Sequence, residues 1–325
     1  MMFTTKELSD KVNRYIADWH YSRRPEGLYA PIQYVLSLGG KRLRPVLMLM
    51  AYNLYRDDVD TILPSAVGLE TYHNYTLLHD DLMDRADMRR NKPTVHKVWD
   101  DNTAILSGDT MLVLAYQQLI RNNDARLKEV LDLFSRTALE IGEGQQYDME
   151  FETRDDVTED EYIEMIRLKT SVLLAAALKM GALLGGAEAE DADRLYDYGI
   201  QVGLAFQLQD DYLDVYGDPA VFGKKIGGDI LCNKKTYMLI NALLRADEAQ
   251  RAELQHWMEA TDYNPEEKVR AVTALYDAIG IRELCDRKIA SYFEEASRIL
   301  TSVQVSDERK EVLKGYVASL MHRNV

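Results

Sequence analysis

One acidic pattern, Asp-Asp-x-x-Asp, occurs twice in this chain and constrains its fold more than any other feature. The copies are Asp80-Asp81-Leu82-Met83-Asp84 and Asp210-Asp211-Tyr212-Leu213-Asp214, and each closes an apolar run with helical spacing. Residues four apart share one face of an α-helix, so each copy aligns two carboxylates. Such like-charged pairs weaken an isolated helix by roughly 0.2–0.5 kcal/mol, which indicates a bound cation. Few hard oxygen ligands suit Mg²⁺, which keeps several waters and is often completed by substrate phosphates.

Acidic residues are frequent here, 54 of 325, so single Asp pairs arise by chance. Asp57-Asp58 and Asp100-Asp101 lack an acid three residues after the second Asp. Asp155-Asp156 has Glu159 at that place, but it lies in a polar stretch that is typical of a helix start. One such motif could be a solvated helix face, whereas two copies after apolar runs indicate a site.

Helical periodicity extends through the whole chain, and strand patterns are weak. A prior of about one domain per 150 residues suggests two domains, but no linker or low-complexity tract divides the sequence. Because 46% of the residues are hydrophobic, a substantial core is possible, and we predict one all-α domain over residues 1–325. We expect helices over 5–20, 31–37, 44–55, 63–84, 104–121, 126–147, 159–184, 189–216 and 235–245, and four more beyond.

The charge distribution narrows the classes of partner. A net charge of -15 argues against a nucleic-acid-binding surface. Basic residues nevertheless form three local groups, which indicate bound anions. The groups are Lys41, Arg42 and Arg44; Arg89, Arg90 and Lys92; and Lys224, Lys225, Lys234 and Lys235.

The first 19 residues lack the apolar core of a signal peptide, so we expect a cytoplasmic protein. The most apolar long segment, residues 171–186, contains Lys179 and is too short to span a membrane. Cys232 and Cys285 lie far apart in the sequence and lack the spacing of metal ligands, so we expect both as free thiols.

Both aspartate motifs and the basic groups belong to an ordered series of signatures. The series is Gly39-Gly40-Lys41-Arg42-Leu43-Arg44-Pro45, Leu77-Leu78-His79-Asp80-Asp81-Leu82-Met83-Asp84, Met88-Arg89-Arg90, Gly108-Asp109, Gly144-Gln145, Lys169-Thr170, Gln207-Leu208-Gln209-Asp210-Asp211-Tyr212-Leu213-Asp214, Phe222-Gly223-Lys224 and Gly228-Asp229-Ile230. With this series the chain resembles the trans-isoprenyl diphosphate synthases, the short-chain polyprenyl synthetases of the farnesyl and geranylgeranyl type. The resemblance implies the isoprenoid synthase fold, a single large bundle of antiparallel helices around a deep central cavity, and usually a homodimer.

The resemblance also implies a reaction and its metal ions. An allylic diphosphate (dimethylallyl, geranyl or farnesyl) ionises, isopentenyl diphosphate attacks the cation head-to-tail, and diphosphate is released. Three Mg²⁺ ions, with Mn²⁺ as an alternative, would neutralise the charge that develops on the leaving group. The implied metal residues are Asp80, Asp81, Asp84, Asp210, Asp211 and Asp214, with Asp211 and Asp214 acting partly through water.

Two diphosphate sites follow from the same resemblance. The catalytic residues implied beside the allylic substrate are Arg89, Lys169, Thr170 and Gln207, and Lys224 and Lys234 complete that site. Isopentenyl diphosphate carries no metal, so side chains alone must meet its charge. The implied residues are Lys41, Arg42, Arg44, His73 and Arg90. Taken alone, His73 would be more typical of a buried structural histidine.

Aromatic residues precede the first motif on the same helix. Tyr75 lies five residues before Asp80, Tyr72 lies about a turn further back, and the smaller Thr76 lies beside them. By resemblance, an aromatic floor at Tyr75 limits the product to C20 geranylgeranyl diphosphate, with C15 farnesyl diphosphate as the close alternative. The alternative for the tyrosines is ordinary core packing.

The chain departs from the family pattern at two positions. Asn233 precedes Lys234, and Asn91 follows Arg90, where the family often has glycine. Asparagine also tolerates left-handed backbone, so the loop of Asn233 can keep its shape.

Two other classes of protein remain open from the sequence. A non-catalytic partner subunit would have lost motif residues, and the key residues are intact here. A terpene cyclase or head-to-head condensing enzyme would lack the Gly-Gly-Lys-Arg stretch and the paired arginines, which this chain has.

Overall fold

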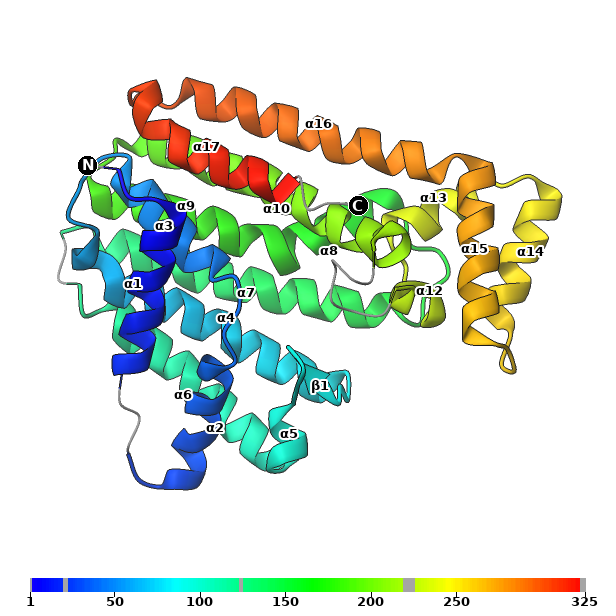
Figure 1. Ribbon diagram of the computed structural model, residues 1–325, viewed down its shortest axis with the longest axis horizontal. Helices are drawn as coiled ribbons and strands as arrows, with labels where there is room; N and C mark the ends of the chain where they lie inside the picture. The colour runs from blue at the N-terminus through cyan, green and yellow to red at the C-terminus, as the bar shows by residue number, and fades with distance from the viewer. Residues whose placement is uncertain (1, 20–22, 123–124, 219–225, 322–325) are drawn as a thin grey trace. The chain divides into compact units, whose positions relative to one another are not determined.

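The computed structural model describes residues 2–19, 23–122, 125–218 and 226–321, and this part of the chain is mostly helical (Figure 1). Its one sheet is a hairpin of two short strands, β1 (Met88–Arg89) and β2 (Lys92–Pro93). The prediction of an all-α fold is confirmed.

The chain forms two compact units from interleaved segments. One unit contains residues 1–134, 177–195 and 304–313, and the other contains residues 135–176, 196–303 and 314–325. Each is described by itself below, and the expectation of a single domain stays a prediction. Four helices contribute to both units: α7 (Leu127–Phe151), α9 (Val172–Gly185), α10 (Ala189–Tyr216) and α17 (Asp307–Met321).

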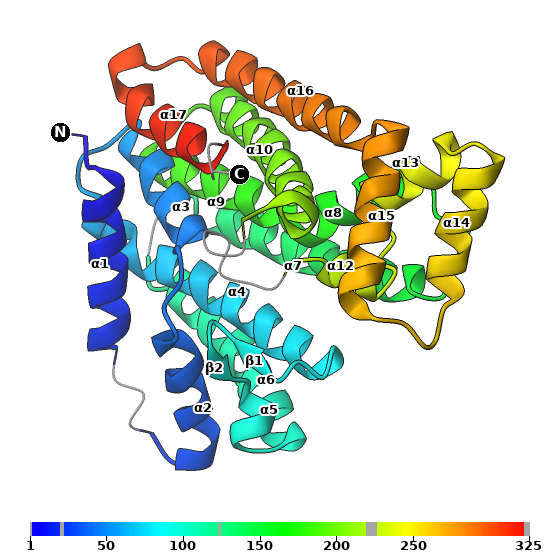
Figure 2. The same ribbon diagram turned by 45° about the vertical axis from the view of Figure 1, so that its right-hand side comes forward.

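The first unit contains the amino-terminal helices. They are α1 (Thr5–Asp18), α2 (Glu26–Ser37), α3 (Leu43–Asn53), the 3-10 turn η1 (Val59–Ile62), α4 (Leu63–Met83), α5 (Val95–Val98) and α6 (Asp101–Leu119). α4 and α6 lie side by side (Figure 2). Gly108 of α6 permits this approach, because a Cβ there would clash with the ring of His79. An apolar cluster that includes Ile32, Leu78 and Met111 is buried in this unit.

The second unit contains most of the later helices. They are α8 (Glu159–Ile166), the π-helical turn η2 (Arg167–Ser171), α12 (Gly228–Leu231), α13 (Tyr237–Arg245), α14 (Glu248–Glu259), α15 (Pro265–Ile279) and α16 (Ile281–Ser302). Its core includes Tyr162, Leu208 and Ile281, which are fully buried. The four helices expected after residue 245 are present as α14 to α17.

Local sequence explains where many helices begin. Capping boxes start α1, α8 and α14, where Thr4, Thr158 and Asp247 each accept a backbone N–H of the first turn. The predicted start of the second helix at Pro31 is wrong, because α2 begins at Glu26 and continues through Pro31. The helix tolerates this proline because Ile32, Val35 and Leu36 are buried beyond it.

One helical stretch in the described residues, Glu159–Gly185, is long and apolar enough to cross a membrane by length and composition. Buried positions make up 83% of its most apolar window. Such burial is typical of a helix in a protein core.

Candidate active site

The first aspartate motif lies at the carboxyl end of α4. Asp80 is half-buried, and Asp84 is exposed at the end of the helix. Asp81 is buried and accepts hydrogen bonds at 2.8 Å from Nε of Arg89, which β1 carries. Carboxylates at this end of a helix oppose its dipole at a cost of about 0.3–1 kcal/mol each. Asp81 therefore orients an arginine, and Asp80 and Asp84 are the carboxylates of this motif on the same helix face.

The second motif lies at the carboxyl end of α10. Asp211 is buried, and its carboxylate accepts from the hydroxyl of Tyr162 and, at 2.9 Å, from Nε2 of Gln207. Burial raises the pKa of Asp211 to about 6, although Lys234 opposes the shift. Asp214 Oδ2 accepts the backbone N–H of Asp229 at 2.9 Å, at the start of α12. Asp214 thus connects the end of α10 to the first turn of α12.

Asp229 adds a further carboxyl group to the second motif. Burial raises its pKa to about 7, with contributions from Asp211 and two more carboxylates of the motif. Because like charges so close disfavour one another's ionisation, this cluster favours a bound cation.

The donor chemistry at both helix ends fits Mg²⁺. Within the described ranges, no group of three or more His, Cys, Asp or Glu side chains could hold a metal ion by itself. Mg²⁺ does not require such a group, because it commonly binds one or two carboxylates and takes water or phosphate oxygens for the rest. Asp80, Asp84 and Asp210 are the motif carboxylates that can serve in this way.

Two predicted lysines meet on a carboxylate that the sequence analysis did not single out. Lys169 Nζ lies 2.6 Å from Asp148 Oδ2, and Lys234 Nζ lies 4.0 Å from Asp148 Oδ1. Burial would raise the pKa of Asp148, but the charges of Lys234 and Lys169 lower it overall. Asp148 lies one turn after Gly144 on α7. This spacing from the Gly144-Gln145 signature is the sequence feature that could have identified it. Lys224, predicted for the same site, is outside the described residues.

Thr170 and Gln207 meet as expected for groups beside one substrate. Thr170 Oγ1 donates to Gln207 Oε1 at 3.0 Å. Both residues line a cavity of about 40 Å³ together with Lys169, Asp211 and Lys234. The structure therefore brings together five residues that the sequence analysis assigned to the allylic and metal sites.

The π-helical turn η2 presents Lys169 and Thr170. A Cβ on Gly144 of α7 would clash with the backbone N of Lys169, and a Cβ on Gly203 of α10 would clash with Ser171. These two glycines allow the neighbouring helices to pack directly on the turn. Turns of this kind are frequent at functional sites.

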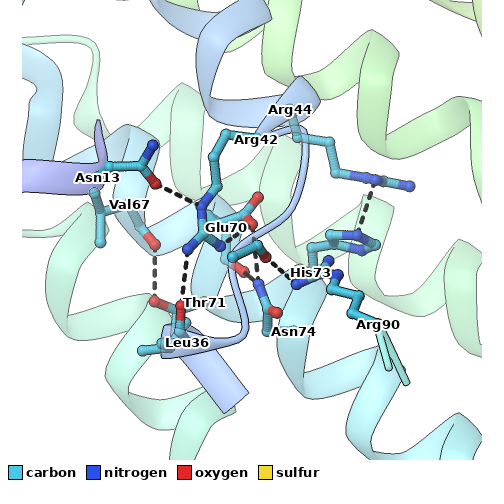
Figure 3. Close-up of polar contacts among 11 residues, drawn as sticks. Asn13, Leu36, Arg42, Arg44, Val67, Glu70, Thr71, His73, Asn74 and Arg90 are labelled. Carbon is cyan, nitrogen blue, oxygen red and sulfur yellow. Dashed lines mark hydrogen bonds and ion pairs between the residues drawn. The ribbon is translucent and has the colours of Figure 1, made fainter. Parts of the chain in front are cut away.

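Three basic residues of the first unit, Arg44, His73 and Arg90, form a cluster (Figure 3). Arg44 Nη1 lies 3.0 Å from His73 Nε2. Arg90 Nη1 donates to the carbonyl of Gly39, and a Cβ on Gly40 would lie 2.7 Å from Arg90 Cζ. Lys41 is exposed at the same turn. Arg44, His73 and Arg90 therefore come together as the sequence analysis expected.

The protonation states of the residues in this basic cluster favour a bound anion. Burial lowers the pKa of Arg44 to about 10, so its guanidinium stays charged at neutral pH. Burial and the nearby arginines lower the pKa of His73 well below its usual range, so its ring is neutral and can accept from Arg44. Arg44 Nε is a buried donor without a hydrogen-bond partner in the described part of the chain. An oxyanion would satisfy it.

Arg42 differs from the rest of the predicted set. It is buried and forms an ion pair with Glu70 at 2.8 Å. Its other nitrogens donate to Asn13 Oδ1 at 3.0 Å and to the carbonyl of Leu36 at 2.8 Å. These contacts favour a structural role for Arg42.

The aromatic residues before the first motif contact one another. The rings of Tyr72 and Tyr75 are 5.5 Å apart, and the ring of Tyr75 is 4.9 Å from that of His79. Tyr72 also packs against Phe134 at 5.0 Å. Thr76 donates its hydroxyl to the carbonyl of His73 at 2.8 Å. A layered aromatic group thus lies one to two turns before Asp80.

Comparison with known proteins identifies the family. Residues 25–276 match the polyprenyl synthetase family. A geranylgeranyl diphosphate synthase of Methanosarcina mazei is 40% identical over 311 residues, which cover 95% of this chain and 94% of that protein. A crystal structure of a geranylgeranyl pyrophosphate synthase superposes with a TM-score of 0.95 at 42% identity and covers 100% of both chains.

The chain belongs to the polyprenyl synthetase family. The predicted resemblance is confirmed, together with the isoprenoid synthase fold and the assignment as a prenyltransferase. Members of this family are typically metal-dependent. A geranylfarnesyl diphosphate synthase of Natronomonas pharaonis is also 39% identical over 255 residues, covering 73% of this chain and 74% of that protein. Relatives of similar identity therefore carry names with different product lengths.

Two departures from the family pattern keep the expected backbone. Asn233 and Asn91 have φ values of 53° and 60°. This left-handed region favours glycine and also accepts asparagine. Both asparagines therefore adopt a backbone conformation that glycine would also accept, and the shape of the loop around Asn233 stays a prediction.

Proposed function

We propose that this polyprenyl synthetase condenses isopentenyl diphosphate head-to-tail with dimethylallyl, geranyl or farnesyl diphosphate. The main product would be geranylgeranyl diphosphate, with farnesyl diphosphate as the shorter alternative. The observation that supports the proposal is that two chemically different groups of charged side chains are present. One is the basic cluster of Arg44, His73 and Arg90, and the other combines aspartates with Lys169 and Lys234.

The two kinds of site correspond to two substrates with different needs. Isopentenyl diphosphate keeps its diphosphate during the reaction, so side-chain charge can hold it. The allylic diphosphate must leave, and Mg²⁺ bound by the aspartates would neutralise the charge that develops on it. We propose Asp80, Asp84 and Asp210 as direct ligands of three Mg²⁺ ions, with Asp81, Asp211 and Asp214 as supporting acids and Mn²⁺ as an alternative metal.

The remaining residues bind and orient the reacting groups. Arg89, Lys169, Lys224 and Lys234 would bind the allylic diphosphate, and Lys41, Arg44, His73 and Arg90 would bind isopentenyl diphosphate. The allylic carbon–oxygen bond breaks, and the double bond of isopentenyl diphosphate forms the new carbon–carbon bond. Thr170 Oγ1 and Gln207 would turn their dipoles toward the allylic cation. The released diphosphate would take the final proton.

Product length would be set by the aromatic group before the first motif. Tyr75 lies closer than Tyr72 to Asp80 along α4, so its ring would meet the growing tail first. Tyr72 lies behind it and packs on Phe134. A cytoplasmic location and the absence of a nucleic-acid partner stay predictions.

We further propose that the protein acts as a homodimer. Leu106, Val113 and Ile120 are 60%, 57% and 51% exposed. They recur every seven residues along α6 and its end, so they share one face. Such spacing suits the packing of two α6 helices from two copies of the chain.

The experiment that tests the function is product analysis. Purified protein would be incubated with Mg²⁺, labelled isopentenyl diphosphate and each allylic primer in turn, and the products would be separated by chromatography. Incorporation of the label into C20 or C15 diphosphate supports the proposal. Allylic consumption without incorporation would instead indicate a cyclase or head-to-head enzyme, and no consumption would indicate a partner subunit.

A further inference from the structure

The ion pair between Arg42 and Glu70 is buried next to the basic cluster of Arg44, His73 and Arg90. The side chains are 3% and 2% exposed, and Arg42 Nη1 lies 2.8 Å from Glu70 Oε1. Asn74 Nδ2 donates to the same Glu70 oxygen at 3.0 Å. Figure 3 shows this pair next to Arg44, His73 and Arg90. A buried pair seldom adds net stability, so a role in fixing one arrangement is the better explanation.

Arg42 connects three helices to the turn that precedes α3. Its guanidinium donates to Glu70 on α4, to Asn13 on α1 and to the carbonyl of Leu36 near the end of α2. Arginine suits this task because its planar group presents several donors in fixed directions. A lysine at this position could not reproduce all three bonds.

The turn itself requires such support. Gly39, Gly40 and Arg42 have φ values of 74°, 127° and 48°. Left-handed backbone at a residue with a side chain costs about 1–2 kcal/mol. The contacts of Arg42 are therefore needed to hold the turn in this conformation.

The same turn carries Lys41 and contacts Arg90 of the basic cluster. Lys41 belongs to it, Gly39 accepts from Arg90, and Gly40 leaves space for the Arg90 guanidinium. On α4, Glu70 and His73 are three residues apart and share one face. When Arg42 meets Glu70, Arg44 is brought within 3.0 Å of His73. The ion pair thus sets the position of α3 along α4.

We propose that Glu70, acting through Arg42, is the positioning residue of the metal-independent diphosphate pocket. The identity of the bound diphosphate as isopentenyl diphosphate rests on the proposed function. Arg42 is then not a ligand of the anion; it holds the turn that presents Lys41, Arg44 and the Arg90 contact.

The direction in which Glu70→Gln changes the affinity for an anion distinguishes this positioning role from a purely electrostatic one. Glu70→Gln removes a negative charge, so charge alone would tighten anion binding. If Arg42 and its turn instead lose their position, anion binding would weaken. We expect the Kd of inorganic diphosphate, titrated calorimetrically in EDTA, to rise about tenfold, because one misplaced charged contact is worth about 1.4 kcal/mol. The KM of isopentenyl diphosphate should rise in parallel, while kcat and the allylic KM change less than about twofold.

A milder variant covers the case in which Glu70→Gln does not fold. Asn13→Ala removes one arm of Arg42 without leaving a buried charge unpaired, and it should raise the same Kd about threefold. Asp60→Asn is the matched control, because it removes the Lys11–Asp60 ion pair of 2.7 Å between α1 and η1 in the same unit. The control should bind diphosphate as the wild type does.

The outcomes are distinct. If a folded Glu70→Gln protein binds diphosphate as tightly as the wild type or more tightly, the positioning role is wrong. If that variant does not fold and Asn13→Ala matches Asp60→Asn, the role is also wrong. A wild type that binds diphosphate without metal but makes no prenyl product would contradict the proposed function alone, since the binding comparison does not depend on turnover.

Discussion

Lys169 and Asp148 form an ion pair of 2.6 Å between the π-helical turn η2 and α7. Lys234 approaches the same carboxylate at 4.0 Å, so one acid holds two lysines that belong to distant parts of the sequence. Asp148 thus supplies negative charge between two cations. A bound diphosphate would supply the same charge, so the two lysines would depend less on the carboxylate when diphosphate is bound.

Asp148→Asn should therefore destabilise the free protein more than the liganded one. Loss of a charged hydrogen-bond partner lowers the free energy of unfolding by roughly 1–3 kcal/mol. Mg²⁺ and diphosphate should then raise the Tm of the variant more than that of the wild type. Thermal unfolding with and without these ligands measures both effects. Asp132→Asn on the same helix, which removes an exposed pair with Lys128, is the control. Equal ligand-induced shifts in Tm would contradict the prediction.

Asp80→Ala and Asp210→Ala should each abolish most turnover while the helical circular dichroism stays near that of the wild type. Both carboxylates are half-buried at helix ends, where removing a negative charge relieves an unfavourable dipole interaction. The fold should thus tolerate the change, whereas metal binding should not. Asp193→Ala, which removes an exposed partner of Lys179, should keep full activity. Global unfolding of the two motif variants would instead assign these aspartates to the core.

The sequence could predict contacts that helical spacing determines. Tyr72 and Tyr75 share a helix, so their ring contact follows from their separation of three residues. The pairing of Thr170 with Gln207 joins different helices, and only the family resemblance placed both beside one substrate. The predicted helices after residue 245 depended on clear breaks at Gly280 and near Asn264.

The contacts that the sequence could not predict depend on tertiary packing. Asp148 is one of 54 acidic residues, and nothing local distinguishes it until Lys169 and Lys234 approach. Arg42 was grouped with its basic neighbours, because its partner Glu70 lies 28 residues away on another helix. The π-helical turn also has no local signature, and the close packing of Gly144 and Gly203 on it joins residues far apart in the sequence.

Tyr75→Ala should lengthen the products. Removing the ring that contacts Tyr72 and His79 opens space before the first motif, and the next rings are those of Tyr72 and Phe134. The product distribution, separated by reversed-phase chromatography, should move by at least one C5 unit. Tyr292→Ala, in the apolar core of the other unit, is the control and should leave the distribution unchanged. An unchanged pattern for Tyr75→Ala would show that another residue sets the limit.

Val113→Glu should dissociate the proposed dimer. It places a charge in the middle of the exposed apolar face of α6, next to Leu106 and Ile120 along the helix. Light scattering after size-exclusion chromatography should give the mass of one chain for the variant and of two chains for the wild type. Leu244→Glu changes an equally exposed leucine on α13, 67% accessible, and should leave the mass unchanged. A wild-type protein that elutes as a single chain would refute the homodimer.

Asn233 connects the loop of Lys234 to two helices, and one of its contacts is with the buried Lys268. Asn233 Nδ2 donates to the carbonyl of Met258, and its Oδ1 accepts from Lys268 Nζ, both at 2.8 Å. Lys268 is 1% exposed and lies 4.5 Å from the ring of Tyr263. The asparagine therefore does more than accept left-handed backbone in place of a glycine.

Asn233→Gly tests this because glycine adopts the same φ without strain, so the side-chain contacts are removed without straining the backbone. Lys268 then loses its acceptor inside the protein, which should lower the free energy of unfolding by about 1–3 kcal/mol. Adding Lys268→Met removes the buried charge, so the double variant should be more stable than Asn233→Gly alone. Urea unfolding of both single variants and the double variant gives the interaction energy. Additive changes in the free energy of unfolding would mean that the two residues act independently. Restored stability in the double variant would instead show that the asparagine is required because the lysine is buried there.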